Sequence, residues 1–313
     1  MERGKVRHIQ SVHVSERTVQ KLLCQHALHK TIYPSLIYDN SASQKGKGTE
    51  FAIRRLVEHL RWHLARYSKN GAIAVIDFKD FFNSIPHDKV IEAMQEGQND
   101  PMICKYIADF VNAFDGTRGL GLGSETSQIG AILYPTPIDK LVKDELGIHC
   151  YARYMDDAYI IHPDRKYVEH CLDRIRDKCV ELNLSLSECK TKIHNLASDD
   201  FVFLKKRVHI TESNKIVLRL TRKNIHDEKQ RIRERRKDYL EGRAPLKAVF
   251  QSYQSWREYA KSYDAYHVVG EMDRFFAETM SDIIAEDLDG MRVDFGRPKL
   301  GNAAEKRRQK VSH

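Results

Sequence analysis

Long apolar runs are missing from this sequence of 313 residues. No window of about 18 apolar residues exists, which excludes a membrane-spanning helix, and the start MERGKVRHIQ lacks the apolar core of a secretory signal. Cysteines in a CxxC pattern are also missing, so neither a zinc ribbon nor a disulfide framework is expected. We therefore expect a cytoplasmic protein with free thiols at Cys24, Cys104, Cys150, Cys171, Cys179 and Cys189.

Acidic residues are in the minority. The chain has 44 Asp and Glu against 52 Lys and Arg, which gives a net charge of +8. Between residues 205 and 244 there are 14 basic and 6 acidic residues, so this one segment holds an excess as large as that of the whole chain. Hydrophobic residues make up 41%, enough to bury a core, which excludes wholesale disorder. The charge predicts an anionic partner, with nucleic acid the first candidate.

Two local patterns place acidic residues at the ends of strands. The run Ala72-Ile73-Ala74-Val75-Ile76 is typical of a buried strand, and Asp77 follows it directly. Residues 150–161 indicate a hairpin with Tyr154-Met155-Asp156-Asp157 at its turn. We therefore expect three carboxylates at the margins of one sheet.

Other segments predict further hairpins and helices. A second hairpin is expected to pair Phe201–Leu204 with Lys215–Leu220. A helix should follow from Ser127, with Pro135 and Pro137 interrupting it, and residues beyond 221 should be almost all helical. Six aromatic residues recur at helical spacing there, which favours a helix-bundle core over a surface that stacks on bases: Phe250, Tyr253, Trp256, Tyr259, Tyr263 and Tyr266.

The three aspartates have a chemistry in common. Buried carboxylates are costly unless a cation compensates them, and hard divalent cations such as Mg²⁺ prefer oxygen ligands. Two such cations about 4 Å apart can activate an attacking hydroxyl and stabilise a leaving oxygen. An isolated Asp156-Asp157 pair is more often a solvated turn, so the neighbouring residues have to decide between the two interpretations.

Three motifs, in a characteristic order along the chain, favour a metal-binding site over a solvated turn. Tyr154-Met155-Asp156-Asp157 matches the YxDD signature, Asp77-Phe78-Lys79-Asp80-Phe81-Phe82 resembles a first catalytic motif, and Leu122-Gly123-Ser124-Glu125-Thr126-Ser127-Gln128 resembles the motif between them. Their order and spacing resemble those of reverse transcriptases, and the resemblance extends from about residue 5 to 275.

The resemblance implies an α+β chain with the right-hand polymerase fold. In this family an antiparallel-sheet palm lies between fingers and a helical thumb. The implied ranges are 1–70 for the fingers and 71–205 for the palm with part of the fingers. They continue with 206–290 for the end of the primer-grip hairpin and the basic thumb, and 291–313 for a basic, disordered tail.

The resemblance also implies the catalytic residues. Asp77, Asp156 and Asp157, with the backbone carbonyl of Phe78, would bind two Mg²⁺ ions, for which Mn²⁺ can substitute. Lys190 resembles the lysine proposed to protonate the departing pyrophosphate, although a lone lysine is more often a solvated surface residue. The reaction is then in-line nucleotidyl transfer, which depends on positioning and charge neutralisation.

Further residues are assigned by position in the family motifs. Phe82 would be the aromatic gate that selects deoxynucleotides, with a place in the core as the alternative. The resemblance implies nucleotide binding by Arg7, Arg17, Lys47, Phe82, Leu122, Gly123, Ser127 and Gln128. It places the primer grip at Phe203, Leu204 and Lys205, and duplex contacts at Arg222, Lys223, Arg231 and Arg235. The alternative for all the basic residues is a solvated charged face.

The middle motif separates lineages within the family. Most prokaryotic relatives carry QGxxxSP, whereas here Leu122 replaces the Gln and Gln128 replaces the Pro. This form resembles the enzymes of diversity-generating retroelements, which copy a template RNA with errors opposite adenines and act with a small helical-bundle accessory variability protein. The chain starts almost at the first fingers motif, which departs from that group. The implied partners are RNA template, DNA or RNA primer, deoxynucleotides and that protein, with no membrane.

Three alternatives stay open. The first alternative is a reverse transcriptase of another prokaryotic lineage, such as the group II intron-like, retron-like or phage-defence enzymes. A catalytically inactive nucleic-acid-binding relative is the second alternative, which the three aspartates disfavour. An RNA-templated RNA polymerase is the third, and the aromatic Phe82 argues against it.

Overall fold

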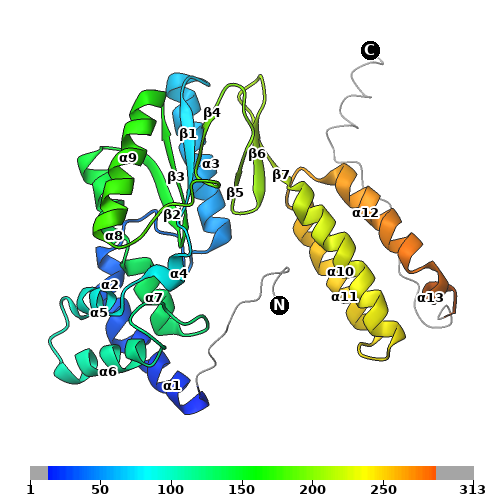
Figure 1. Cartoon of the computed structure of the whole chain (residues 1–313). Coiled ribbons are helices and arrows are strands. Elements are labelled where there is room, and N and C mark those ends of the chain that lie inside the picture. The colour runs from blue at the N-terminus through cyan, green and yellow to red at the C-terminus, as the bar shows by residue number, and fades with distance from the viewer. Residues whose placement is uncertain (1–12, 287–313) are drawn as a thin grey trace. The chain divides into compact units, whose positions relative to one another are not determined.

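The computed structural model describes residues 13–286 (Figure 1). Contacts divide the chain into two compact units between Val217 and Leu218, and each unit is described by itself. Arg7 and the tail 291–313 lie outside the described residues, and the predicted domain boundaries stay predictions. Among residues 13–286 no helix has the length and apolar character needed to cross a membrane, and all six cysteines are free thiols.

The first unit begins with helices. Helix α1 (Val14–Leu23) runs through a π-helical stretch, Cys24–Leu28, into the short α2 (His29–Ile32), and a turn of 3₁₀ helix, Tyr33–Ser35, follows. After a loop of residues 36–48, the long helix α3 (Thr49–Tyr67) leads to the sheet.

A four-stranded antiparallel sheet forms the centre of the first unit. Its order is β2 (Cys150–Tyr154), β3 (Asp157–His162), β1 (Ala72–Asp77) and β4 (Lys192–Asn195). All six residues of β1 are buried, because the strand has a neighbouring strand on each edge and packs against α9 (Arg165–Glu181) and β5 (Phe201–Phe203). The predicted strand before Asp77 and the predicted hairpin around the Asp156-Asp157 turn are both present.

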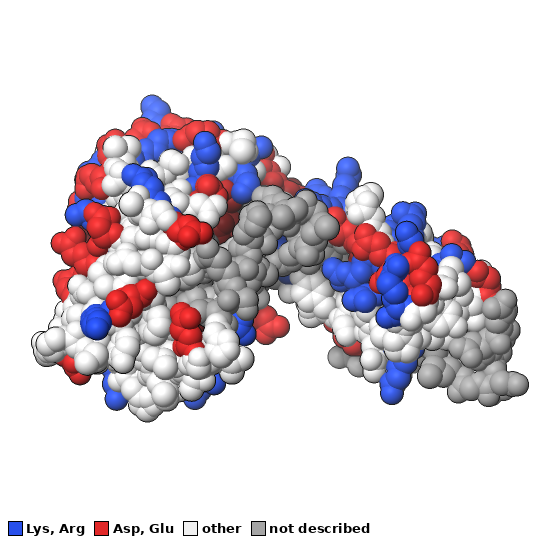
Figure 2. Space-filling model, turned by 60° about the horizontal axis from the view of Figure 1, so that its bottom comes forward, with Lys and Arg blue, Asp and Glu red and all other residues white. Residues whose placement is uncertain are grey.

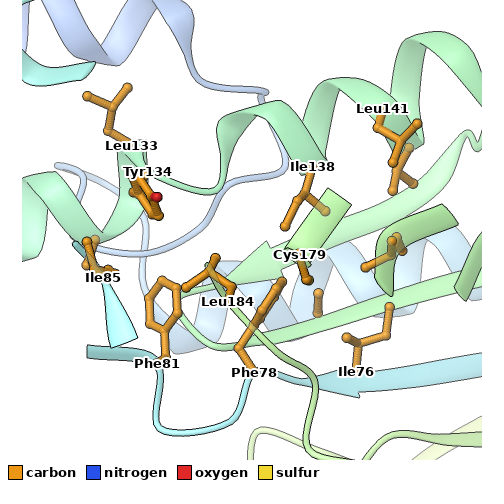
Figure 3. Close-up of a cluster of buried hydrophobic side chains, with 14 of the residues drawn as sticks. Ile76, Phe78, Phe81, Ile85, Leu133, Tyr134, Ile138, Leu141, Cys179 and Leu184 are labelled. Atoms are coloured by element: carbon orange, nitrogen blue, oxygen red, sulfur yellow. The ribbon is translucent and has the colours of Figure 1, made fainter. Parts of the chain in front are cut away.

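Helices α3 and α9 (Arg165–Glu181) cover opposite faces of this sheet (Figure 1). Successive residues of a strand point to opposite faces, so Ala158 and Ile160 join a cluster with Ile175 of α9. Tyr159, between them, donates to or accepts from Nδ1 of His59 on α3 at 2.8 Å. Figure 3 shows part of the cluster on the α9 side, where Ile76 and Cys179 lie among other apolar side chains.

The helices between β1 and β2 extend from beside the sheet into the lower part of this unit in Figure 1. They are α4 (Phe81–Ser84), α5 (His87–Gln95), α6 (Pro101–Asn112), α7 (Glu125–Leu133) and α8 (Thr136–Lys140), and a π-helical turn, Leu141–Glu145, follows. The helix expected from Ser127 begins at Glu125, since Ser124 caps it. The predicted interruption is present, because α7 ends at Leu133 and Pro135 precedes α8.

A three-stranded sheet corrects the second predicted hairpin. Its order is β5 (Phe201–Phe203), β6 (Lys206–Ile210) and β7 (Ile216–Leu220), so β6 lies between the two strands that were expected to pair. Leu204 and Lys205 have φ values of 45° and 64°, which closes a tight turn directly after β5. The charged residues at the start of β6 conceal its alternation of buried positions, which the structure shows at Val208 and Ile210.

The second unit is a helical bundle of α10 (Arg222–Leu240), α11 (Leu246–Lys261), α12 (Tyr266–Thr279) and α13 (Ser281–Glu286). The prediction that the aromatic stripe forms a bundle core is confirmed for Phe250, Tyr253 and Trp256, which are buried. It is wrong for Tyr259 and Tyr266, which are 41% and 50% exposed. Repeated steps of three residues fall short of a helical turn of 3.6, so the stripe drifts off the buried face, and Ala260 is buried in place of Tyr259.

Candidate functional site

The three predicted aspartates lie at one end of the four-stranded sheet. Asp77 is the last residue of β1 and stands opposite Asp157, the first residue of β3, in the antiparallel register. Asp156 lies in the turn before Asp157, and its carbonyl accepts a hydrogen bond of 2.9 Å from the N–H of Phe78. Because backbone pairing fixes all three positions, we call this group of Asp77, Asp156 and Asp157 the carboxylate end of the sheet.

Three acidic side chains lie close together at the carboxylate end. Burial, together with the charges of Asp156 and Asp77, raises the pKa of Asp157 to about 7. The positive charges of Lys190 and Lys205 act in the opposite direction without cancelling this rise. A carboxyl group that is hard to ionise beside two others indicates a place where a cation is favourable.

Lys190 supplies one positive charge. Its Nζ donates to both carboxylate oxygens of Asp77, at 2.9 and 2.8 Å, and this hydrogen bonding raises the pKa of Lys190. The segment before it is tied to β1, since the N–H of Ser187 donates to the Asp77 carbonyl at 2.7 Å. Lys190 is therefore held beside Asp77, and its predicted role stays a prediction.

The carboxylate end fits a divalent cation in its chemistry. Among residues 13–286 no three His, Cys, Asp or Glu side chains converge into a formed metal centre. Directly opposite residues of an antiparallel pair have Cα atoms about 4.5–5.5 Å apart, so side-chain rotation alone can bring Asp77 and Asp157 onto one ion. Oxygen donors and excess negative charge are what Mg²⁺ or Mn²⁺ requires.

Phe82 lies close to the residues that precede Leu122 and Gly123. Phe81 is buried in the core, whereas Phe82 is only half-buried and meets Phe81 edge to face at 5.6 Å. The N–H of Leu120 donates to the Phe82 carbonyl at 2.9 Å, which places the residues that precede Leu122 and Gly123 beside α4. Phe82 therefore keeps an accessible part, as a gate requires.

Ser127 and Gln128 occupy the first turn of α7 and differ in their surroundings. Ser127 is buried, and its Oγ has no hydrogen-bond partner in the structure. Gln128 is exposed, and its Oε1 accepts a hydrogen bond of 3.1 Å from Oγ of Ser43. The structure thus joins the motif between the aspartates to the loop of residues 36–48.

The basic fingers residues have different places. Nζ of Lys47 donates to the carbonyls of Tyr38 at 2.8 Å and Asn40 at 3.0 Å, and burial lowers the pKa of Lys47. Its ammonium thus holds the loop of residues 36–48. Arg17 lies exposed on α1, one turn before Gln20, whose Oε1 accepts from Oγ of Ser124 at 2.9 Å.

The predicted primer-grip residues form the turn after β5. The ring of Phe203 is buried and meets the ring of Tyr159 edge to face at 5.1 Å. Lys205 is exposed, and its charge reaches Asp157, whose pKa it lowers. This turn therefore lies near the carboxylate end, within the first unit.

The four predicted duplex-binding residues lie on α10 in the second unit. Arg222, Lys223 and Arg235 are exposed, while Arg231 is half-buried and donates from Nη1 to Oε2 of Glu228 at 2.8 Å. In Figure 2, blue Lys and Arg side chains stand among red Asp and Glu on this unit.

Sequence reasoning missed a buried group of polar residues beside the Asp156 turn. Arg153 and Asp139 are fully buried, and Asn40 bridges to Arg153. The one available signal was a charged residue at an inward position of the apolar strand 150–154. Its partner Asp139 lies 14 residues earlier in a helix, which no local pattern predicts.

Comparison with known proteins gives a family and a fold. Residues 2–233 match the family model described as reverse transcriptase (RNA-dependent DNA polymerase). A comparison with curated protein sequences finds no match.

The similar solved structures include two telomerases. One, from Candida albicans in complex with a fragment of telomeric RNA, has a TM-score of 0.50 at 11% identity, covering 87% of this chain and 47% of that chain. Apo telomerase from Candida tropicalis has a TM-score of 0.47 at 14% identity, covering 90% and 60%. The chain thus spans about half the length of the first of these proteins, and the first likeness bears on the fold alone. Because the family model matches most of its residues, the chain belongs to the reverse transcriptase (RNA-dependent DNA polymerase) family.

Proposed function

We propose that the chain is an RNA-directed DNA polymerase that copies RNA into cDNA by metal-dependent nucleotidyl transfer. The observation that carries this proposal is the register of β1 and β3, which sets Asp77 opposite Asp157 with Asp156 in the adjoining turn. Membership of the reverse transcriptase family supports the same reaction. The closest alternative is a reverse transcriptase of another lineage with the same chemistry.

The carboxylate end would hold two Mg²⁺ ions, with Mn²⁺ as a substitute. When bound, the ions lower the pKa of the primer 3′-hydroxyl and neutralise the triphosphate. Asp77, Asp156 and Asp157 provide carboxylate oxygens, and the Phe78 carbonyl is the fourth proposed ligand. The raised pKa of Asp157 supports this role, because a cation there stabilises the ionised carboxylate.

Lys190 would act as the proton donor to departing pyrophosphate. Its Nζ lies 2.8 Å from an Asp77 oxygen, so the lysine is already beside a proposed metal ligand. The ammonium of Lys190 is protonated at neutral pH, as a proton donor requires, and the hydrogen bonds to Asp77 that raise its pKa have to be released before the proton is transferred.

The incoming deoxynucleotide would lie between Phe82 and the first turn of α7. The accessible edge of Phe82 is proposed to exclude a ribose 2′-hydroxyl. Ser127 Oγ lacks a partner while buried, which is costly without a ligand or water to satisfy it. Leu122, Gly123 and Gln128 are proposed to line the same place, and Arg7, Arg17 and Lys47 are proposed for the triphosphate and template.

Primer and duplex would be held by two further elements. The turn of Phe203, Leu204 and Lys205 is proposed as the primer grip, and the charge that Lys205 places near Asp157 supports this. Arg222, Lys223, Arg231 and Arg235 of α10 are proposed to contact phosphates, which give sequence-independent affinity. In the terms of the family, these elements would belong to the palm and thumb of the right-hand fold.

Within the family, we propose the error-prone enzyme of a diversity-generating retroelement. Leu122 and Gln128 support this assignment, because they replace the Gln and Pro of the usual prokaryotic motif. An apolar Leu122 makes no polar check on the nascent base pair, which lowers selectivity. The accessory variability protein is then the expected partner.

Primer extension by the purified protein tests both levels of the proposal. The reaction contains an adenine-rich RNA template, a DNA primer, Mg²⁺ and deoxynucleotides, and every cDNA is sequenced. We expect product with errors concentrated opposite template adenines. Accurate product would contradict the retroelement assignment while leaving the polymerase, whereas absent synthesis with RNA still bound would favour an inactive nucleic-acid-binding relative.

A further inference from the structure

A fully buried ion pair lies beside the turn that carries Asp156. The side chains of Arg153 and Asp139 have no solvent exposure, and Nε and Nη2 of Arg153 donate to the two Asp139 oxygens at 2.8 and 2.6 Å. The hydroxyl of Tyr151 donates to Oδ1 of Asp139 at 2.6 Å. Removing two charges from water is expensive, and apolar residues of similar volume often pack there equally well. Stability alone therefore does not explain the pair.

The remaining donors of Arg153 reach two other parts of the first unit. Nη2 also donates to the Ile132 carbonyl of α7 at 2.8 Å, and Nη1 donates to the Met155 carbonyl of the turn at 3.3 Å. Asn40 donates from Nδ2 to the same Ile132 carbonyl at 3.1 Å. One side chain thus joins α7, α8 and the turn that precedes Asp157.

The backbone of Arg153 joins a third segment. Its N–H donates to the Asp39 carbonyl at 3.1 Å, and its carbonyl accepts from the N–H of Ser41 at 2.9 Å. The loop of residues 36–48, which contains Lys47, is therefore fixed to the strand that leads into the Asp156 turn. Arg153 is the shared point of that loop, α7 and the turn.

The turn itself needs support. Met155 has a φ of 54°, a left-handed conformation that costs energy for a residue with a Cβ. Such a conformation persists only where surrounding contacts hold it, and Nη1 of Arg153 is bonded to the carbonyl of this residue. A flat guanidinium with five donors can serve Asp139, Ile132 and Met155 together, which a lysine ammonium cannot.

We propose that Arg153 is a positioning residue that, through the Met155 carbonyl, sets the place of Asp156 and Asp157 for binding divalent metal. This inference rests on the proposed function, since it gives those aspartates a metal to bind. Asp139 orients the guanidinium of Arg153 and balances its charge. The loop of residues 36–48, α7 and the Asp156 turn are thereby held in fixed positions beside the carboxylate end.

Replacing the whole triad by apolar residues separates this role from folding. The variant Tyr151→Phe/Asp139→Leu/Arg153→Met leaves no buried charge, and the Ile132 carbonyl keeps its bond from Asn40. We expect it to unfold near the wild-type midpoint. We expect Mn²⁺ affinity, measured by calorimetry, and kcat to fall about 10- to 100-fold, the usual loss when a residue behind a metal ligand is removed. KM for deoxynucleotide should change much less.

The second unit offers a matched control. There Tyr253 donates to Asp273 at 2.6 Å, and Nε of Arg257 bonds both oxygens of Asp273 at 2.9 and 3.0 Å, which repeats the same three residue types. The variant Tyr253→Phe/Asp273→Leu/Arg257→Met should leave Mn²⁺ affinity at the wild-type value. Equal losses in both triple variants would overturn the proposal, because the effect would then come from generally weaker folding.

Arg153→Lys covers the case in which the triple variant does not fold. It keeps the charge beside Asp139 but loses the fork that reaches Met155, so we expect a folded protein with weakened Mn²⁺ binding and lower kcat. Wild-type Mn²⁺ affinity and kcat in this variant would overturn the proposal. Mn²⁺ binding is measured without nucleic acid, so a wild-type protein that binds Mn²⁺ but makes no cDNA would refute the proposed function and not the role of Arg153.

Discussion

The carboxylate end of the sheet and the surface of α10 treat charge in opposite ways. At the carboxylate end, like charges are brought together by strand pairing, and Asp157 is driven toward its neutral form. On α10, Arg222 and Lys223 are exposed to water, where their charge costs little. The clustered aspartates repel one another, and binding of a compact cation would relieve this repulsion. The exposed basic residues of α10 instead form a broad surface suited to a polyanion. We infer a chemical site in one unit and a binding surface in the other.

Removing a carboxylate from the site should give the largest effect. In Asp157→Asn we expect nucleotide incorporation to fall roughly 10²–10³-fold, because one charged partner of the transition state is lost. Asp109→Asn, an exposed carboxylate on α6, should retain wild-type rates in the same single-nucleotide assay. Equal incorporation rates in Asp157→Asn and Asp109→Asn would contradict the proposal that Asp157 takes part in catalysis.

The second largest effect should be on the pH dependence of the free energy of unfolding, through His59, which is buried in the first unit. Burial lowers the pKa of His59 to about 4, so between pH 4 and 6.5 the unfolded chain binds more protons than the folded one. Stability from this group is therefore present above pH 6.5 and is lost as pH falls toward 4, by about 3 kcal/mol. The free-energy difference between wild type and His59→Gln, from urea unfolding, should change by that amount.

A histidine of the second unit gives the contrast for this measurement. His267 is exposed on α12, so His267→Gln should stay within about 0.5 kcal/mol of the wild-type free energy of unfolding, as surface substitutions usually do. A His59→Gln difference that stays flat with pH would mean that His59 is not buried in its neutral form.

Fidelity should respond to Leu122. Leu122→Gln restores a polar side chain next to the proposed nucleotide place, so errors opposite template adenine should fall about tenfold, a difference of one good hydrogen bond to the base pair. Leu122→Met keeps the apolar character and volume and should keep the wild-type error spectrum. Sequencing of cDNA from both variants measures the error spectrum. An unchanged spectrum in Leu122→Gln would contradict the proposal that Leu122 lowers fidelity.

The smallest effect is expected on α10. Arg222→Gln/Lys223→Gln should weaken binding of an RNA–DNA duplex by a similar factor for all sequences, and should reduce the slope of log affinity against log salt by about 2. Lys247→Gln, on α11, should leave the slope unchanged, and fluorescence anisotropy at several salt concentrations measures both. A sequence-dependent loss would contradict a phosphate-binding surface.

The sequence predicted the parts of the site that depend on local pattern. The apolar run before Asp77 and the hairpin around Asp156 follow from short-range periodicity, and the structure contains both. Proline is disfavoured in the interior of a helix, so α7 ends before Pro135, whereas Pro137 is accommodated in the first turn of α8.

Other parts depend on partners distant in the sequence and could not be predicted. Strand β6 begins with basic residues that resemble a solvated segment, and only its place between β5 and β7 makes it a strand. The bond from Ser43 to Gln128 spans 85 residues, and the buried charge of Arg153 depends on a helix that precedes its strand. No local propensity encodes such pairs, because tertiary packing alone brings them together.

A thiol at Asp77 tests most directly whether the carboxylate end holds the metal that drives synthesis. Thiolates prefer softer metals to Mg²⁺, so Asp77→Cys should be inactive with Mg²⁺ and should recover primer extension when Cd²⁺ is supplied. Asp88→Cys, at an exposed position of α5, should stay active with Mg²⁺ throughout. Full activity of Asp77→Cys with Mg²⁺ would contradict the account, because the last residue of β1 would then not be a ligand of the catalytic metal.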